Sequence, residues 1–228
     1  MIVNISKTKT MHIARNSKVQ NIYIDGIRVE QVQNFKYLGT LVSSSGRVEE
    51  DINYRLNCAG RLFNAIKTVF LNRKEVTKKT KISIYKSTFI PTLTYSSESW
   101  VLTEKLSSKL QGKEMRYLRK VEGKTRMNRI RNTVIRRQLE QQPLIETIDK
   151  NQLRWFGHLT RMEESRLPKK AYITKMGAAR PKGRPRKTWK EEIENRSAKG
   201  NITLKKAEEL ATNRKEWRVT YNNLYTAR

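Results

Sequence analysis

The chain has 228 residues, and its 49 lysines and arginines exceed its 21 aspartates and glutamates to give a formal net charge of +28. Apolar residues make up 36%, which is below the usual share but enough for a core, so the chain is neither a disordered tail nor an acidic enzyme. This charge indicates a polyanionic partner, RNA or DNA before an anionic membrane, and no apolar run is long enough to span a membrane.

The residues that could form a catalytic metal centre are few and scattered. The three aspartates are Asp25, Asp51 and Asp149, and the two histidines are His12 and His158. Two-metal chemistry on nucleic acids needs clustered carboxylates, and zinc needs Cys or His residues at short spacing. We therefore expect no metal or cofactor in this chain. The single cysteine and the absence of a signal-peptide pattern favour an intracellular protein.

The first 48 residues are predicted to form β-strands. Residues 20–24 and 27–32 alternate between apolar and polar positions, and the intervening Asp25-Gly26 is a strong hairpin signal. Residues 35–42 are predicted to form one further strand, which ends at a serine-rich turn. Within it, Gly39 would either let a nucleic-acid backbone approach closely or form a tight bend, and the bend is favoured.

From Glu49 the apolar residues recur at steps of three and four, which predicts amphipathic helices. The expected helices cover roughly residues 49–70, 77–93, 103–121, 131–142, 144–156, 189–196 and 204–221. The fold class is therefore α+β: a short N-terminal antiparallel β-hairpin segment, then a mainly α-helical bundle, then a basic, partly flexible tail. The expected domain ranges are 1–48, 49–166 and 167–228.

A basic stripe lies on the helix predicted for residues 103–121. Its members recur at helical spacing and are Lys105, Lys109, Lys113, Arg116 and Arg119. Such a stripe suits the phosphates of a duplex and would make binding depend steeply on salt. The alternative is a solvated helix face, which is less favoured because like charges four residues apart destabilise a helix.

A second basic signal lies in the tail. It consists of Arg180, Lys182, Arg184, Arg186 and Lys187, interspersed with proline and glycine. This run resembles an AT-hook, an extended segment that places arginines in the minor groove of A·T-rich DNA. It would equally serve as a nuclear import signal, which favours a nuclear location. The alternative is a basic linker in which the order of residues is immaterial.

Aromatic residues near position 155 allow two interpretations. Trp155, Phe156 and His158 lie among arginines and could stack on bases. The favoured interpretation is that Trp155 and Phe156 anchor their helix in the core, with His158 at its rim.

The order of several segments resembles the carboxy-terminal region of the endonuclease–reverse transcriptases of non-LTR retrotransposons. Asn4–Met11 resembles polymerase motif D, and Phe35–Gly39 resembles motif E, the primer grip. Downstream, the resembling segments are Tyr85-Lys86 with Pro91, Tyr95–Trp100, Leu153–Leu159 and Gly183–Arg186.

The resemblance implies the end of a polymerase palm at 1–48, a helical thumb at 49–166 and a basic extension at 167–228. It implies that Phe35, Tyr37, Leu38 and Gly39 form the primer grip, and that either Lys7 or Lys9 is the motif D lysine. The family enzyme uses Mg²⁺ held by carboxylates that precede these motifs. The chain is therefore expected to bind template–primer nucleic acid, RNA and DNA, without polymerising.

Two other hypotheses stay open. One is a stand-alone DNA-binding chromatin module that uses Arg184 and Arg186 in the minor groove. The other is a genomic transposon relic without a selected function, whose N-terminal strands would expose apolar edges and promote aggregation.

Overall fold

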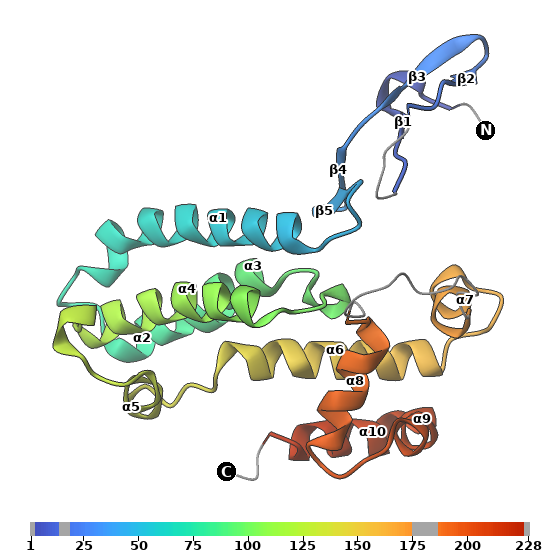
Figure 1. The fold of residues 1–228 in the computed structure, drawn as a ribbon. Helices are drawn as coiled ribbons and strands as arrows, with labels where there is room; N and C mark the ends of the chain where they lie inside the picture. The colour runs from blue at the N-terminus through green and yellow to red at the C-terminus, as the bar shows by residue number, and fades with distance from the viewer. Residues whose placement is uncertain (1–2, 14–18, 175–186, 226–228) are drawn as a thin grey trace. The chain divides into compact units, whose positions relative to one another are not determined.

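The computed structural model describes residues 3–13, 19–174 and 187–225. It contains two compact units that alternate along the chain: unit 1 comprises Met1–Tyr95 and Glu104–Arg129, and unit 2 comprises Ser96–Thr103 and Ile130–Arg228. Strands come first and helices follow, which confirms the α+β class (Figure 1). The assignment of chain ranges to a palm end, a thumb and an extension stays a prediction.

The elements of unit 1 begin with short strands. They are the 3-10 turn η1 (Ile5–Lys7), then β1 (Lys9–Thr10), β2 (Ile22–Ile24), β3 (Ile27–Gln31), β4 (Asn34–Tyr37) and β5 (Thr40–Ser43). The helical elements of this unit are α1 (Glu49–Ile66), η2 (Lys67–Leu71), α2 (Lys78–Ile84), η3 (Tyr85–Phe89), α3 (Ile90–Thr94), α4 (Glu104–Glu122) and η5 (Arg126–Asn128).

The regular elements among the described residues of unit 2 are all helical. Its elements are η4 (Ser97–Ser99), α5 (Asn132–Gln138), α6 (Leu144–Thr160), α7 (Leu167–Ile173), α8 (Trp189–Ala198), α9 (Leu204–Thr212) and α10 (Arg214–Asn223). The short segment 96–103 belongs here because Gln152 of α6 donates from Nε2 to the carbonyls of Ser97 at 2.7 Å and Trp100 at 2.9 Å.

The predicted hairpin at Asp25-Gly26 is confirmed. β2 and β3 pair antiparallel, and both turn residues have positive φ, 50° at Asp25 and 75° at Gly26. This geometry is that of the type I′ turn, which matches the twist of paired strands. β1 adds to the other edge of β3 in parallel. The resulting sheet leaves Tyr23 and Ile27 more than half exposed, at 59% and 55%.

The single strand predicted for residues 35–42 is wrong. These residues form the antiparallel pair β4–β5, joined by a two-residue turn at Leu38-Gly39 with φ of 46° and 88°. The apolar run continues through the turn, so the alternating pattern does not reveal it. Leucine is also an unusual residue at a left-handed position, where its Cβ is crowded. The tight bend favoured at Gly39 is confirmed.

The core of unit 1 is a cluster of aromatic rings between α1, α2–α3 and α4. Tyr117 of α4 lies at its centre, with ring centroids 4.7 Å from Phe89, 5.2 Å from Tyr85 and 6.1 Å from Phe63. The Tyr117 hydroxyl donates to the Lys81 carbonyl at 2.9 Å, and burial raises its pKa above the usual range. Tyrosine therefore fills the core while its polar end stays hydrogen-bonded.

The core of unit 2 joins α6 to the C-terminal helices. Phe156 and Trp217 are fully buried with ring centroids 5.5 Å apart, and the Trp217 indole donates to the Leu153 carbonyl at 2.7 Å. The single helix predicted for 204–221 is wrong, because it divides at Asn213. The Asn213 side chain caps α10 by accepting from the N–H groups of Lys215 and Glu216.

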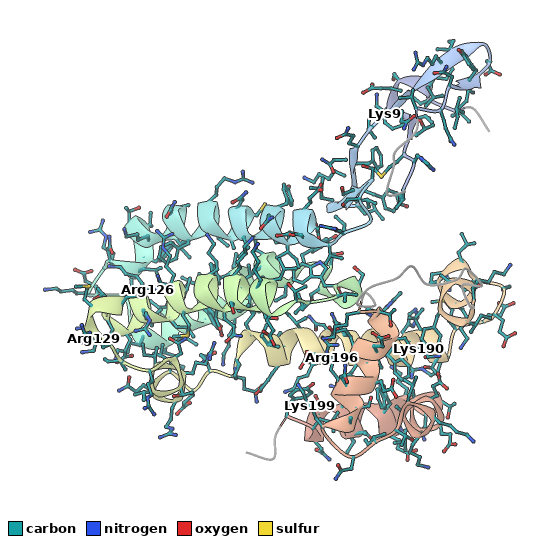
Figure 2. The ribbon with its side chains drawn as sticks, viewed as in Figure 1. Lys9, Arg126, Arg129, Lys190, Arg196 and Lys199 are labelled. Carbon is teal, nitrogen blue, oxygen red and sulfur yellow. The ribbon has the colours of Figure 1, made fainter. Side chains whose placement is uncertain are left out.

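A buried ionic network also holds unit 2 together. Asp149 of α6 accepts from Arg196 Nε at 2.6 Å, Lys199 Nζ at 2.8 Å and the Tyr225 hydroxyl at 3.0 Å. Glu192 forms an ion pair with Nη1 of the same Arg196 guanidinium at 2.6 Å. Figure 2 labels Arg196 and Lys199 at α8. Buried charges need partners of opposite charge, since an uncompensated one is strongly destabilising.

Close packing at one helical glycine gives a testable prediction. A Cβ on Gly157 would lie 2.4 Å from Trp217 Cδ1 and 2.7 Å from its Nε1. Gly157→Ala should therefore lower the free energy of unfolding by about 1–3 kcal/mol through overpacking, although alanine is the better helix former. Urea unfolding followed by tryptophan fluorescence measures this change.

The matched control is Gly112→Ala in α4, where a new Cβ would meet no atom within 4 Å. This change should raise the free energy of unfolding by up to about 1 kcal/mol through helix propensity alone. An equal increase in the free energy of unfolding in both variants would contradict the packing described at Trp217.

Candidate nucleic-acid interface

The β4–β5 turn presents apolar and aromatic groups to solvent beside a cation. Tyr37 is 61% exposed and Leu38 is 76% exposed. Next to them, Lys36 Nζ donates to the Tyr54 hydroxyl at 2.8 Å and lies 5.1 Å from the centre of that ring. Exposed rings near cations can stack on bases while the cations contact phosphates.

Three side chains hold this turn in place, and we call them the turn clamp: Asp51 and Arg55 of α1, and Tyr95. The Tyr95 hydroxyl donates to the Leu38 carbonyl at 2.8 Å, and the Arg55 guanidinium donates to the Gly39 carbonyl. Arg55 also lies over the Tyr95 ring, 4.4 Å from its centre. Asp51 accepts from the backbone N–H of Leu41 at 3.0 Å, which fixes the following strand.

The clamp offsets the strain of the turn. A non-glycine residue in the left-handed region costs about 1–2 kcal/mol. A hydrogen bond contributes about 0.5–1.5 kcal/mol, and more when one partner is charged. The bonds from Tyr95 and Arg55 together therefore suffice to hold Leu38 at its positive φ. The turn is a rigid projection rather than a loose loop.

The residues expected to form a primer grip all lie on β4 and this turn. Phe35 and Gly39 are half-buried, whereas Tyr37 and Leu38 project into solvent. A Cβ on Gly39 would touch the Tyr95 ring at 3.4 Å, and the φ of 88° disfavours any other residue there. Their role as a grip stays a prediction.

All five residues of the predicted basic stripe lie on α4, and Lys109, Lys113 and Arg116 lie beside α1. Lys109 pairs with Glu49 at 3.6 Å, and the Arg116 guanidinium lies 4.8 Å from the centre of the Phe63 ring. Lys113 reaches the backbone of α1 at Gly60. Lys105 is exposed, and Arg119 donates from Nη1 to the Thr125 carbonyl at 3.3 Å. Binding of phosphates by the stripe stays a prediction.

The surroundings of Lys113 affect the charge of its side chain. Burial of its ammonium group against α1, together with the nearby charge of Arg116, lowers its pKa below the usual 10.5. Both effects disfavour the charged form in the folded chain.

The two candidate motif D lysines have different surroundings. Lys9 of β1, which Figure 2 labels, pairs with Glu30 of β3 at 2.5 Å. Lys7 is exposed at the end of η1, where its backbone N–H donates to the side chain of Asn4. The choice between the two lysines stays open.

Most of the AT-hook-like run lies outside the described residues, namely Arg180, Lys182, Arg184 and Arg186. Its last member, Lys187, pairs with the buried carboxylate of Glu192 in unit 2. Lys187 therefore has a structural contact besides its predicted role in binding.

The aromatic residues near position 155 mainly build unit 2. Phe156 is fully buried, which confirms that it anchors the core. Trp155 is half-buried and its ring lies 5.2 Å from that of the exposed His158.

Sequence reasoning did not identify Tyr54, Arg55 or Tyr95 as parts of the interface. One signal was present: Arg55 follows Asp51 by four residues, the spacing at which opposite charges meet on a helix. Nothing local connects Tyr95 to a turn 57 residues earlier.

Within the described ranges, no group of three or more His, Cys, Asp or Glu side chains could hold a metal ion. In the same residues no helix combines the length and apolar character needed to cross a bilayer.

The chain is 25% identical to a transposon-derived protein of Caenorhabditis elegans over 233 aligned positions, which cover 94% of this chain and 80% of the relative. This match fits a transposon origin. No family model matches the chain, and no solved structure matches it.

The turn clamp generates a prediction on stability. Leu38→Asn should raise the free energy of unfolding by about 1 kcal/mol, because asparagine tolerates positive φ and Asn-Gly is a preferred type I′ turn. Tyr95→Phe should lower it by about 1 kcal/mol, because the Leu38 carbonyl loses its donor. Chemical denaturation measures both changes, and destabilisation by Leu38→Asn would contradict the strain assigned to the turn.

Lys113 generates a prediction on pH. The lowered pKa means that protonated Lys113 destabilises the fold at neutral pH, and that this cost fades as the pH rises toward 10.5. Lys113→Met should therefore stabilise the chain more at about pH 7 than at about pH 10. Unfolding at both pH values tests this, with Lys105→Met on the exposed part of α4 as the matched control.

Proposed function

We propose that the chain is the template–primer-binding carboxy-terminal part of a non-LTR retrotransposon reverse transcriptase, and that it does not polymerise by itself. Unit 1 contacts the nucleic acid, with Tyr37 and Leu38 at the end of the primer and the basic residues of α4 along the phosphates. The observation that carries the proposal is the rigid β4–β5 turn, whose exposed side chains match the primer-grip segment by resemblance.

The construction of the turn supports this role. A strained, exposed leucine occupies this position although asparagine would suit the backbone better, and a clamp of three residues holds the turn. Strain that the surroundings maintain is common at functional sites. The transposon-derived relative supports the same origin.

The exposed apolar residues of the first sheet also support the proposal. Ile22, Tyr23 and Ile27 are each at least two-fifths exposed, at 42%, 59% and 55%. Strands with apolar faces of this kind normally pack within a larger sheet. The end of a polymerase palm would have this property.

The proposal predicts a specific role for Tyr37. Tyr37→Ala should weaken binding of the full chain to an RNA–DNA template–primer about tenfold, because stacking of a base on an aromatic ring contributes about 1–3 kcal/mol. Fluorescence anisotropy with a labelled primer measures the affinity.

The matched control is Tyr23→Ala on β2, since Tyr23 is 59% exposed and Tyr37 is 61% exposed. The control should leave the affinity unchanged. Equal losses in both variants, or none in either, would count against the turn as the site of contact.

The absence of polymerase activity is tested by primer extension with Mg²⁺ and deoxynucleotides. Each aspartate of the chain has a structural position: Asp25 in a turn, Asp51 in the clamp and Asp149 in the ionic network. We expect binding without extension. Sustained incorporation by the purified chain would overturn this part of the proposal.

A further inference from the structure

The segment after α4 is a basic loop with one prominent apolar side chain, and we call Gly123–Arg129 the α4 loop. Met127 is 88% exposed, more than any other large hydrophobic residue in the described part of the chain. Arg126 and Arg129, which Figure 2 labels, are exposed before and after Met127 in the chain. Nothing in the proposed primer contacts uses this loop.

Hydrogen bonds make the α4 loop rigid. α4 ends at Gly123, whose φ is 69°, and the N–H of Lys124 donates back to the Arg119 carbonyl at 2.9 Å. This is a Schellman-type end, which fixes the direction of the departing chain. The loop thus starts from a defined position on the helix.

A second set of bonds closes the loop beneath Met127. The Asn128 side-chain oxygen accepts from the Thr125 N–H at 2.7 Å and from the Thr125 hydroxyl at 3.1 Å. The Arg129 N–H donates to the Arg126 carbonyl at 3.0 Å, and Arg129 has a φ of 51°. The closed turn therefore holds the Met127 side chain outward, away from the core.

The charge of the α4 loop is entirely positive. Lys124, Arg126 and Arg129 lie in it, and the sequence has no acidic residue from 123 to 139. Glu122, just before the loop, pairs with Lys78 at 2.8 Å. The loop therefore offers cations to a polyanion without a competing carboxylate of its own.

We propose that the α4 loop is a wedge that enters the minor groove of duplex DNA, with Met127 inserted between two base pairs. Apolar side chains that unstack a base step and kink the duplex are typical of minor-groove proteins, and arginines are attracted to a narrow minor groove. Methionine suits the position because its side chain is long, unbranched and adaptable. This inference rests on the proposed binding of nucleic-acid duplexes.

The wedge predicts a local change in DNA that affinity alone does not report. The probe is a B-form duplex with a central TA step. The base beside this step is 2-aminopurine, whose fluorescence rises when it is unstacked. The two ends of the duplex carry a pair of dyes for energy transfer. Pyrimidine–purine steps are the easiest to unstack. Binding of the full chain should raise the 2-aminopurine fluorescence and bring the duplex ends closer.

Met127→Ala should remove at least about half of both signals while lowering affinity less than about threefold, because the phosphate contacts persist. Met127→Leu should retain both signals. The double variant Arg126→Gln with Arg129→Gln should weaken binding. It should also make the slope of log affinity against log salt shallower by about 2, as expected for two lost phosphate contacts. Leu167→Ala, at a residue 79% exposed in unit 2, is the control that should change nothing.

The outcomes separate the two proposals. If the wild-type chain binds the duplex but neither signal changes, or if Met127→Ala keeps both signals, the wedge is overturned and the proposed function stands. If the wild-type chain binds neither this duplex nor the template–primer at low salt, the proposed function fails and the wedge fails with it.

Discussion

The main constraint on this molecule is its shortage of carboxylates, because it has 21 aspartates and glutamates but 49 lysines and arginines. The structure uses several inside the units: Asp51, Glu114, Asp149 and Glu192 are each no more than 5% exposed. There they bind groups that would otherwise be buried without a partner, such as Arg196 between Asp149 and Glu192. The surface therefore keeps an excess of cations, which favours a polyanionic partner.

The two exposed projections of unit 1 follow the same construction. At the β4–β5 turn, Asp51, Arg55 and Tyr95 hold a leucine at positive φ. At the α4 loop, Arg119 and Asn128 hold a methionine between two arginines. In each case polar side chains fix the backbone, so that an apolar side chain can remain in water. Apolar groups presented in this way, next to cations, suit a partner with both stacked bases and phosphates.

The sequence predicted those features whose cause is local. The Asp25-Gly26 hairpin and the helices from Glu49 onward each have a signal within a few residues. The Leu38-Gly39 turn was missed because tertiary contacts from Arg55 and Tyr95 stabilise it against the preference of leucine. The break between α9 and α10 is not predicted because the apolar pattern continues on both sides of Asn213, whose side chain caps α10. For the candidate site, helical spacing predicted the basic stripe on α4. The position of Lys113 and Arg116 beside α1 depends on tertiary packing, which the sequence pattern does not reveal.

The central claim is that unit 1 binds a nucleic-acid duplex through several phosphates. It is tested most directly by the affinity of the full chain for an RNA–DNA template–primer as KCl rises from about 50 to about 400 mM. Each phosphate contact contributes about −0.9 to the slope of log affinity against log salt. We expect a slope of about −4.5 or steeper, as for five or more contacts. A slope near zero, or no binding at the lowest salt, would contradict the account.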